Sequence, residues 1–158
     1  MAVMVGIVFV TALSSSAIAG IEPQALNSDI KITVVSHDDM IALKGDLARY
    51  FRKEGLKAVA VKVLVENNSA NPIPVYWGSF KLRDQDHEIA GPSLYATGKR
   101  PYLEFMTLQP NDKVSAWIGF EAKIGVNLSE SMIRYDQIPN GYSDLSMISD
   151  WFPVNQNK

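Results

Sequence analysis

Alternating valines dominate residues 57–69 of the chain. They occupy every second position, as Val59, Val61, Val63 and Val65. Successive side chains of an extended chain point to opposite faces, so the valines share one face, and β-branched residues favour the half-buried surface of a sheet. The run ends at Asn67, Asn68 and Ser69, which are turn formers. We therefore predict that this segment is the central strand of an antiparallel sheet.

Further extended segments lie before and after this strand in the sequence. They are residues 30–35, 75–84, 102–108, 113–121 and 132–135. In the segment 113–121, one face carries Val114, Ala116, Ile118 and Phe120, which we expect to share an apolar layer with the four valines. Strands separated by Pro, Asn and Gly, with no alternating helices, are typical of an all-β sandwich. We expect residues 143–152 to form a short helical or irregular tail.

Residues 39–54 carry a different pattern. Met40, Leu43, Leu47 and Phe51 lie at helical spacing, and Gly55 suits the end of a helix. The same residues also fit an extended connection in an otherwise β chain. We predict a short helix over roughly this segment.

The N-terminal segment predicts export. Residues 1–19 contain no charged side chain, and their apolar run is about as long as the core of a signal peptide, well short of the roughly 20 residues of a spanning helix. Ala17 and Ala19 form the small-x-small pattern that precedes a cleavage site. An uncleaved anchor and a buried N-terminal strand are the alternatives. We predict a signal peptide over 1–19, a single β-sandwich domain over 20–158 with no stable membrane span, and a periplasmic or secreted location.

Composition excludes several classes of function. The chain contains no cysteine, which excludes disulfides, thiolate catalysis and thiolate metal sites. Its 15 Lys and Arg residues nearly balance its 17 Asp and Glu residues, and no long run of one sign occurs. We therefore expect no nucleic-acid partner.

Three motifs together resemble a known family. They are residues 58–68, a hydrophobic strand ending in asparagines; residues 80–84, with Phe-x-Leu-x-Asp; and residues 108–121, where Leu-x-Pro leads to a strand with Phe120. This pattern is similar to the telokin-like, immunoglobulin-fold domains of secreted bacterial proteins, whose function is mostly unassigned. The resemblance covers residues 56–121 and implies an immunoglobulin-like antiparallel β-sandwich and export, with no catalytic residues. Asn111 stands where the family usually has glycine, and Asp84 is followed by no glycine until Gly91.

Two tryptophans are candidates for a partner-binding face. If Phe80, Leu82 and the even residues of 114–120 face the core, then Trp77 and Trp117 point away from it. Lys81 and Arg83 then share the outward face with Trp77. Exposed tryptophans in polar surroundings often anchor a protein or glycan partner. The alternative is that both rings pack in the core or at its edge.

A polar segment near the middle of the chain is a candidate calcium site. Asp84, Asp86 and Glu88 alternate as the first oxygen ligands of a calcium loop do. The glycine of an EF-hand is replaced by Ile89, and a solvated hairpin turn is the alternative. No other cofactor is expected.

The chain shows no strong catalytic signature. His37 and His87, the only histidines, are separated by 50 positions, and Gly-x-Ser-x-Gly does not occur. We therefore expect an exported, non-enzymatic binding domain whose partner is a protein or glycan of the cell envelope. The alternatives are a calcium-stabilised structural domain and, less favoured, a hydrolase that uses a histidine with a carboxylate such as Asp38 or Asp39.

Overall fold

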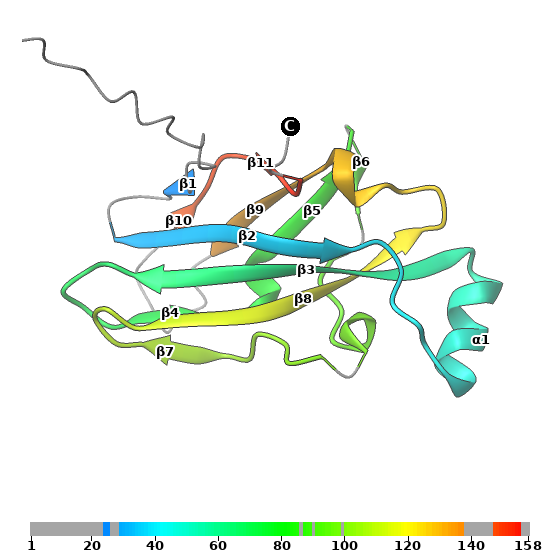
Figure 1. Ribbon diagram of the computed structural model, residues 1–158, viewed down its shortest axis with the longest axis horizontal. Coiled ribbons are helices and arrows are strands. Elements are labelled where there is room, and N and C mark those ends of the chain that lie inside the picture. Colours follow the sequence, from blue (N-terminus) through cyan, green and yellow to red (C-terminus); the bar gives the residue numbers. More distant parts are fainter. Residues whose placement is uncertain are drawn as a thin grey trace, which may run out of the picture.

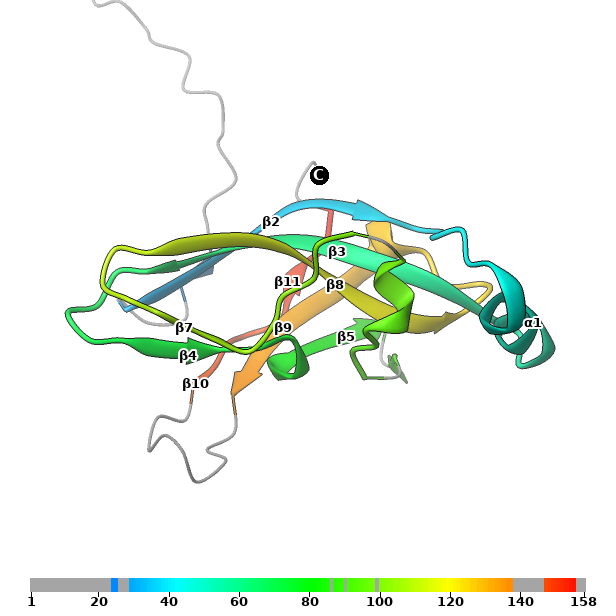
Figure 2. The same ribbon diagram turned by 90° about the horizontal axis from the view of Figure 1, so that it is seen from below.

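Two antiparallel sheets pack face to face in the computed structural model, with one helix at an end of the sandwich (Figures 1 and 2). The structure describes residues 24–25, 29–85, 87–89, 91–98, 100–137 and 147–155. The prediction of an all-β sandwich is confirmed. The predicted signal peptide, residues 1–19, lies outside the described residues.

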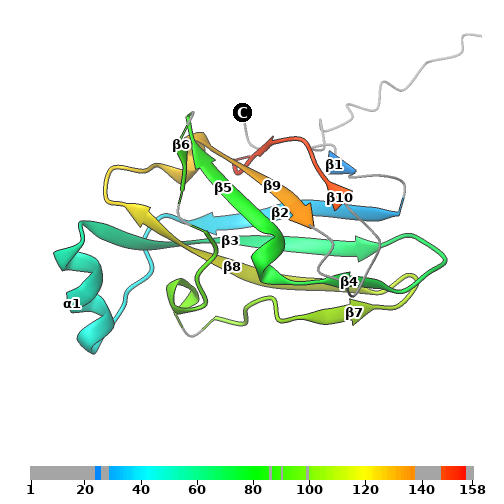
Figure 3. The ribbon, with the colours of Figure 1, turned by 180° about the vertical axis from the view of Figure 1, so that it is seen from behind.

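The three longest strands, β2, β3 and β8, all belong to the first sheet. The elements in chain order are β1 (Gln24–Ala25), β2 (Ile30–Asp38), α1 (Gly45–Lys53), β3 (Leu56–Asn67), β4 (Ile73–Val75), η1 (Trp77–Ser79), β5 (Phe80–Asp84), β6 (His87–Glu88), η2 (Tyr95–Thr97), β7 (Met106–Leu108), β8 (Lys113–Lys123), η3 (Leu128–Glu130), β9 (Ser131–Gln137), β10 (Met147–Ile148) and β11 (Phe152–Pro153). The first sheet has the strand order β1-β2-β3-β8. The second has the order β10-β9-β5-β6, with β11 also paired to β9, and β4 and β7 form a separate ribbon (Figure 3).

The predicted central strand is β3. It pairs with β2 on one side and β8 on the other, and Val59 lies opposite Phe120, Val61 opposite Ile118 and Val63 opposite Ala116. These side chains are buried between the two sheets together with Phe80, Leu82, Ile133 and Tyr135 of the second sheet. The predicted alternation, and the shared apolar layer with β8, are confirmed.

The helix is shorter than predicted. It covers Gly45–Lys53, while residues 40–44 are not helical. The backbone N–H of Ile41 donates to the carbonyl of Ala58 at 2.8 Å, and this hydrogen bond holds the segment against β3. The helix ends at Lys53 with Glu54 as its C-cap, and Gly55 follows with a φ of +65°, a conformation that glycine adopts without strain and that is typical of a helix C-terminus.

The expected strand over residues 75–84 is interrupted, which corrects the prediction. Its first residue belongs to β4, Trp77–Ser79 form a turn of 3-10 helix, and only Phe80–Asp84 pair with β9. The Tyr76 ring covers Gly78 so closely that any Cβ there would collide with it. Strict alternation back from Phe80 and Leu82, which put Trp77 outside, would also put Val75 and Ser79 outside, but both are buried, so the face assignment before Phe80 was wrong.

Two other segments also differ from the prediction. Within residues 102–108 only Met106–Leu108 form a strand, although Tyr102 makes an isolated bridge to Trp117. The tail contributes two short strands, β10 and β11, which both pair with β9. A hydrogen bond also joins the tail to β9: the backbone N–H of Tyr135 donates to the hydroxyl of Ser149 at 2.9 Å.

A second, smaller core lies on the outer face of the first sheet. Its buried members are Ile41, Phe51, Ala58, Ala60 and Ala96. Small residues let chain segments approach the sheet there: a Cβ on Gly119 would lie only 2.6 Å from the carbonyl oxygen of Ser93 and from the backbone nitrogen of Thr97. Helix α1 and the η2 segment therefore cover part of a face that a simple sandwich leaves to solvent.

Candidate functional site

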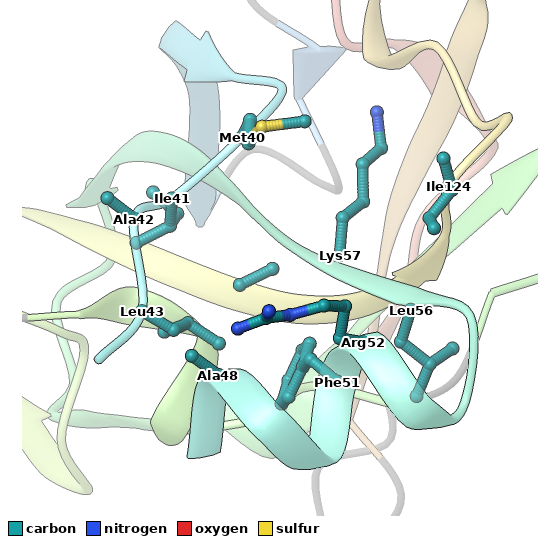
Figure 4. Close-up of a pocket in the computed structure, with 11 residues that line it drawn as sticks. Met40, Ile41, Ala42, Leu43, Ala48, Phe51, Arg52, Leu56, Lys57 and Ile124 are labelled. Carbon is teal, nitrogen blue, oxygen red and sulfur yellow. The ribbon is translucent and has the colours of Figure 1, made fainter. Parts of the chain in front are cut away.

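An apolar pocket of about 430 Å³ lies beneath α1, where β3 extends beyond the end of β2 (Figure 4). The last pair of the β2–β3 ladder is Asp38 with Ala60, whereas β3 begins at Leu56. The open end of β3, the departing segment after β2 and one side of α1 together form the walls. The lining residues are Met40, Ile41, Ala42, Leu43, Ala48, Phe51, Arg52, Leu56, Lys57, Ala58 and Ile124.

Small side chains leave this space open. Ala42, Ala48 and Ala58 line the pocket from three different segments, and Phe51 is buried beside them. Ala48, Phe51 and Arg52 share one face of α1 because residues three and four apart on a helix lie side by side. A pocket of this volume falls within the range of roughly 300–1,000 Å³ found for small-molecule sites.

Only two of the lining side chains carry a charge, and both are positive. Figure 4 shows Arg52 on the helix side of the pocket and Lys57 extending from β3 toward the side where Met40 and Ile124 lie. Met40 and Ile124 are 67% and 59% exposed, respectively. The site thus combines apolar walls, an apolar rim and two cationic groups, a combination suited to an apolar ligand that ends in a negative charge.

The tryptophans of the predicted partner face lie in different environments. Trp77, in η1 before β5, is partly buried against the main core between the sheets. Trp117, on β8, is partly buried against the second core on the outside of the first sheet. Both rings are therefore partly buried and pack against different cores, and their role in binding a partner stays a prediction.

A neighbouring arginine covers Trp117. The Arg100 guanidinium carbon lies 4.4 Å from the centre of the Trp117 ring, and Arg100 also forms an ion pair with Asp38. Burial alone would raise the pKa of Asp38, but the hydrogen bonds from Arg100 and from the Met40 backbone, with the positive charge of Arg100, hold that pKa below its ordinary value. This arrangement fixes the Trp117 ring.

The two basic residues of the predicted face lie on the outer side of β5. Lys81 is opposite Arg134 of β9, and Arg83 lies 4.5 Å from the centre of the Trp151 ring. Arg134 approaches the same ring at 4.7 Å. Trp151 was missed at the sequence level because it lies in the tail, far from β5 along the chain.

Two residues of the candidate calcium site, Asp84 and Glu88, belong to the paired strands β5 and β6. Asp84 pairs with His87, and Arg83 pairs with Glu88. Asp84 and Glu88 are therefore strand residues and not successive positions of one calcium-binding loop. Asp86 lies outside the described residues. A second pocket, of about 430 Å³, is lined there by Asp84, Glu88 and Glu121 among others. Within the described part of the chain, no group of three His, Asp or Glu side chains is arranged to hold a metal ion.

The two histidines lie in different sheets. His37 belongs to β2, opposite Val61 of the first sheet, and its ring is 3.7 Å from the carboxylate of Asp39. His87 belongs to β6 of the second sheet. The structure does not bring the two imidazoles together.

Comparison with known proteins identifies the family. A domain of unknown function, DUF4352, matches residues 20–142. This chain belongs to the DUF4352 family. No match is found among curated proteins.

Two solved structures share the fold of this DUF4352 domain. One is ycdA of Bacillus subtilis, a candidate lipoprotein, with a TM-score of 0.55 and 14% identity over 84% of the present chain, which covers only 39% of the Bacillus chain. The other is a functionally unknown protein from Listeria monocytogenes, with a TM-score of 0.53 and 10% identity over 80% of the present chain and 78% of its own. At these identities the likeness concerns the fold alone. Among the described residues, no helix has the length and apolar character required to cross a membrane.

The pocket beneath α1 lies entirely within the part of the chain that matches DUF4352. Sequence reasoning missed it, because its walls come from three segments whose contacts are set by the tertiary structure. One signal was present: Arg52 follows Phe51 on the side of α1 that also carries Ala48, so a cation borders the helix's apolar face. On a helix that merely covers a core, cations lie on the opposite side.

Proposed function

We propose that this protein is an exported, non-enzymatic binding domain of the cell envelope that takes an apolar group of its ligand into the pocket beneath α1. The observation that carries the proposal is the pocket itself, with its apolar walls and its exposed rim of Met40 and Ile124. Burial of such surface yields about 25 cal/mol per Å² of apolar area removed from water.

Two observations support the location. Residues 1–19 have the apolar run and the small-x-small pattern of a signal peptide. A protein of similar fold, ycdA, is described as a candidate lipoprotein, a class attached to the envelope. The intact mass of the protein recovered from its source cells tests this part: a chain beginning at Gly20 supports cleavage and export, and a chain retaining residues 1–19 contradicts it.

The binding role is tested by native mass spectrometry of the protein purified without detergent from the envelope fraction. We expect a bound small molecule on the natural protein and none on Ala48→Phe, whose ring would fill the pocket from α1. Ala70→Phe, on the exposed loop between β3 and β4, is the matched control and should keep the ligand. The same adduct on the natural protein and on Ala48→Phe would contradict the use of this pocket.

A calcium-stabilised structural domain is the second candidate: Asp84, Glu88 and Glu121 line one pocket beside the β5–β6 hairpin, but these described side chains do not gather around a single metal position. Carboxylate oxygens are the ligands calcium prefers. Thermal melts with calcium and with a chelator test it. A higher Tm with calcium, abolished in Asp84→Asn, would support the candidate, and identical midpoints would contradict it.

A further inference from the structure

We infer that the ligand of the pocket beneath α1 is a free single-chain amphiphile, a linear alkyl chain that ends in an anionic head such as a carboxylate. This inference rests on the proposed function and names the chemistry of the ligand. It depends on the two cations of the pocket, which form no ion pair with any residue that the structure describes.

Neither cation is neutralised within the described structure. The ion pairs found between described residues involve other basic groups, and none uses Arg52 or Lys57. Two carboxylates are near in sequence or register, Glu54 at the end of α1 and Glu121 opposite Ala58, but neither lines the pocket. A ligand with a negative end would therefore supply the missing counter-charge.

The walls favour an alkyl chain over a peptide. A bound peptide needs partners for its backbone N–H and C=O groups, which are costly to bury unpaired. The lining side chains other than Arg52 and Lys57 offer no hydrogen-bonding group, and at the open end of β3 the carbonyl of Ala58 already accepts a hydrogen bond from the N–H of Ile41. An alkyl chain needs none, and a volume of about 430 Å³ suits one chain and not the paired chains of a bilayer lipid.

The stems of Arg52 and Lys57 can extend the apolar wall while their charged ends reach solvent. This places the anionic head at the mouth of the pocket and the chain inside, against Phe51 and Ala58. Affinity should then rise with chain length by about fourfold for each buried CH₂, from about 0.8 kcal/mol per group.

Calorimetric titration of the full exported chain with decanoate and with 1-decanol tests the inference, and NMR shift changes locate the bound probe. We expect decanoate to bind about tenfold more tightly than 1-decanol, with shift changes at residues 40–43, 48–58 and 124. In the double variant Arg52→Gln/Lys57→Gln this preference should disappear while 1-decanol binding is retained. Lys44→Gln/Lys53→Gln, which removes the same charge from the ends of α1, should keep the preference.

Each outcome separates the inference from the proposed function. Equal binding of decanoate and 1-decanol at the pocket would overturn the anionic head and leave the apolar pocket standing. If neither probe shifted these residues, the proposed pocket would fall as well. Vesicles of phosphatidylglycerol form the last arm: binding to vesicles without binding of free decanoate would overturn the inference in favour of a membrane surface.

Discussion

The side-chain amide of Asn67, at the end of β3, donates a hydrogen bond of 2.9 Å to the backbone carbonyl of Leu108 in β7. The same amide donates to the carbonyl of Asn71 at 2.8 Å, and its oxygen accepts hydrogen bonds from the backbone and the hydroxyl of Ser69. Asn67 is fully buried. One side chain therefore joins the central strand to the turn that follows it and to the β4–β7 ribbon.

Removal of this amide should be costly. Asn67→Ala leaves buried carbonyl and N–H groups without partners, and we expect the free energy of unfolding to fall by about 2–3 kcal/mol. Urea denaturation measures the change. Asn68→Ala, at an exposed neighbouring position, is the control and should stay within about 0.5 kcal/mol of the natural protein. Equal effects of the two variants would contradict the role given to Asn67.

Gly119 should not tolerate a side chain. A Cβ there would lie 2.6 Å from backbone atoms of Ser93 and Thr97, which cannot move without displacing the η2 segment. We expect Gly119→Ala to lower the free energy of unfolding by about 3 kcal/mol. Gly125→Ala, where nothing lies within 4 Å, is the matched control and should be neutral or slightly stabilising. A neutral Gly119→Ala in thermal melts would show that η2 does not lie against β8 as described.

Asn111 should accept glycine and reject valine. Its φ is +68°, and Pro110 precedes it, as in a type II turn. Asparagine tolerates this conformation better than other residues with a side chain. We expect Asn111→Gly to leave the free energy of unfolding unchanged or raise it by up to about 1 kcal/mol, and Asn111→Val to lower it by about 1–2 kcal/mol. The reverse order in urea denaturation would exclude the left-handed conformation.

The Asp38–Arg100 pair should contribute a pH dependence to stability. Because the pKa of Asp38 is lowered in the folded protein, its stabilisation is fully present above its ordinary pKa, near 3.8, and is lost as the pH falls through the folded value. We expect the difference in stability between the natural protein and Asp38→Asn to be largest near neutral pH and to vanish in acid. Asp46→Asn, which removes the exposed partner of Arg49, is the control. A difference that grew toward low pH would contradict the assignment.

Truncation of either partly buried tryptophan should destabilise the fold. Trp117 packs on the second core and Trp77 on the main core. We expect Trp117→Ala and Trp77→Ala each to lower the free energy of unfolding by about 2 kcal/mol. Tyr95→Ala, a ring that is 71% exposed, is the control with little expected effect. Normal stability of both variants, with loss of a partner, would instead restore the predicted contact face.

Much of the fold was predictable because it follows from local rules. The β-branched residues at every second position of Val59–Val65 indicated which face of β3 meets the other sheet, and the same rule worked for β8. Rules of this kind failed at residues 75–79 because Trp77–Ser79 form a turn of 3-10 helix and do not continue the extended chain. The pocket beneath α1 was not foreseen, because its lining residues come from segments that are far apart in the sequence.

The sequence by itself determined which side chains of β3 and β8 alternate between the two faces, the turns at Asn67 and Asn111, and the end of the helix just before Gly55. Each of these depends on neighbouring residues and their backbone preferences. Only the tertiary structure decided what covers the outer face of the first sheet. A hydrogen bond from Ile41 to Ala58 and the close approach at Gly119 bring distant segments onto that face. The same contacts partly bury Trp117 and leave a pocket beneath α1 whose two cations form no ion pair with the described residues. No local pattern encodes such long-range packing.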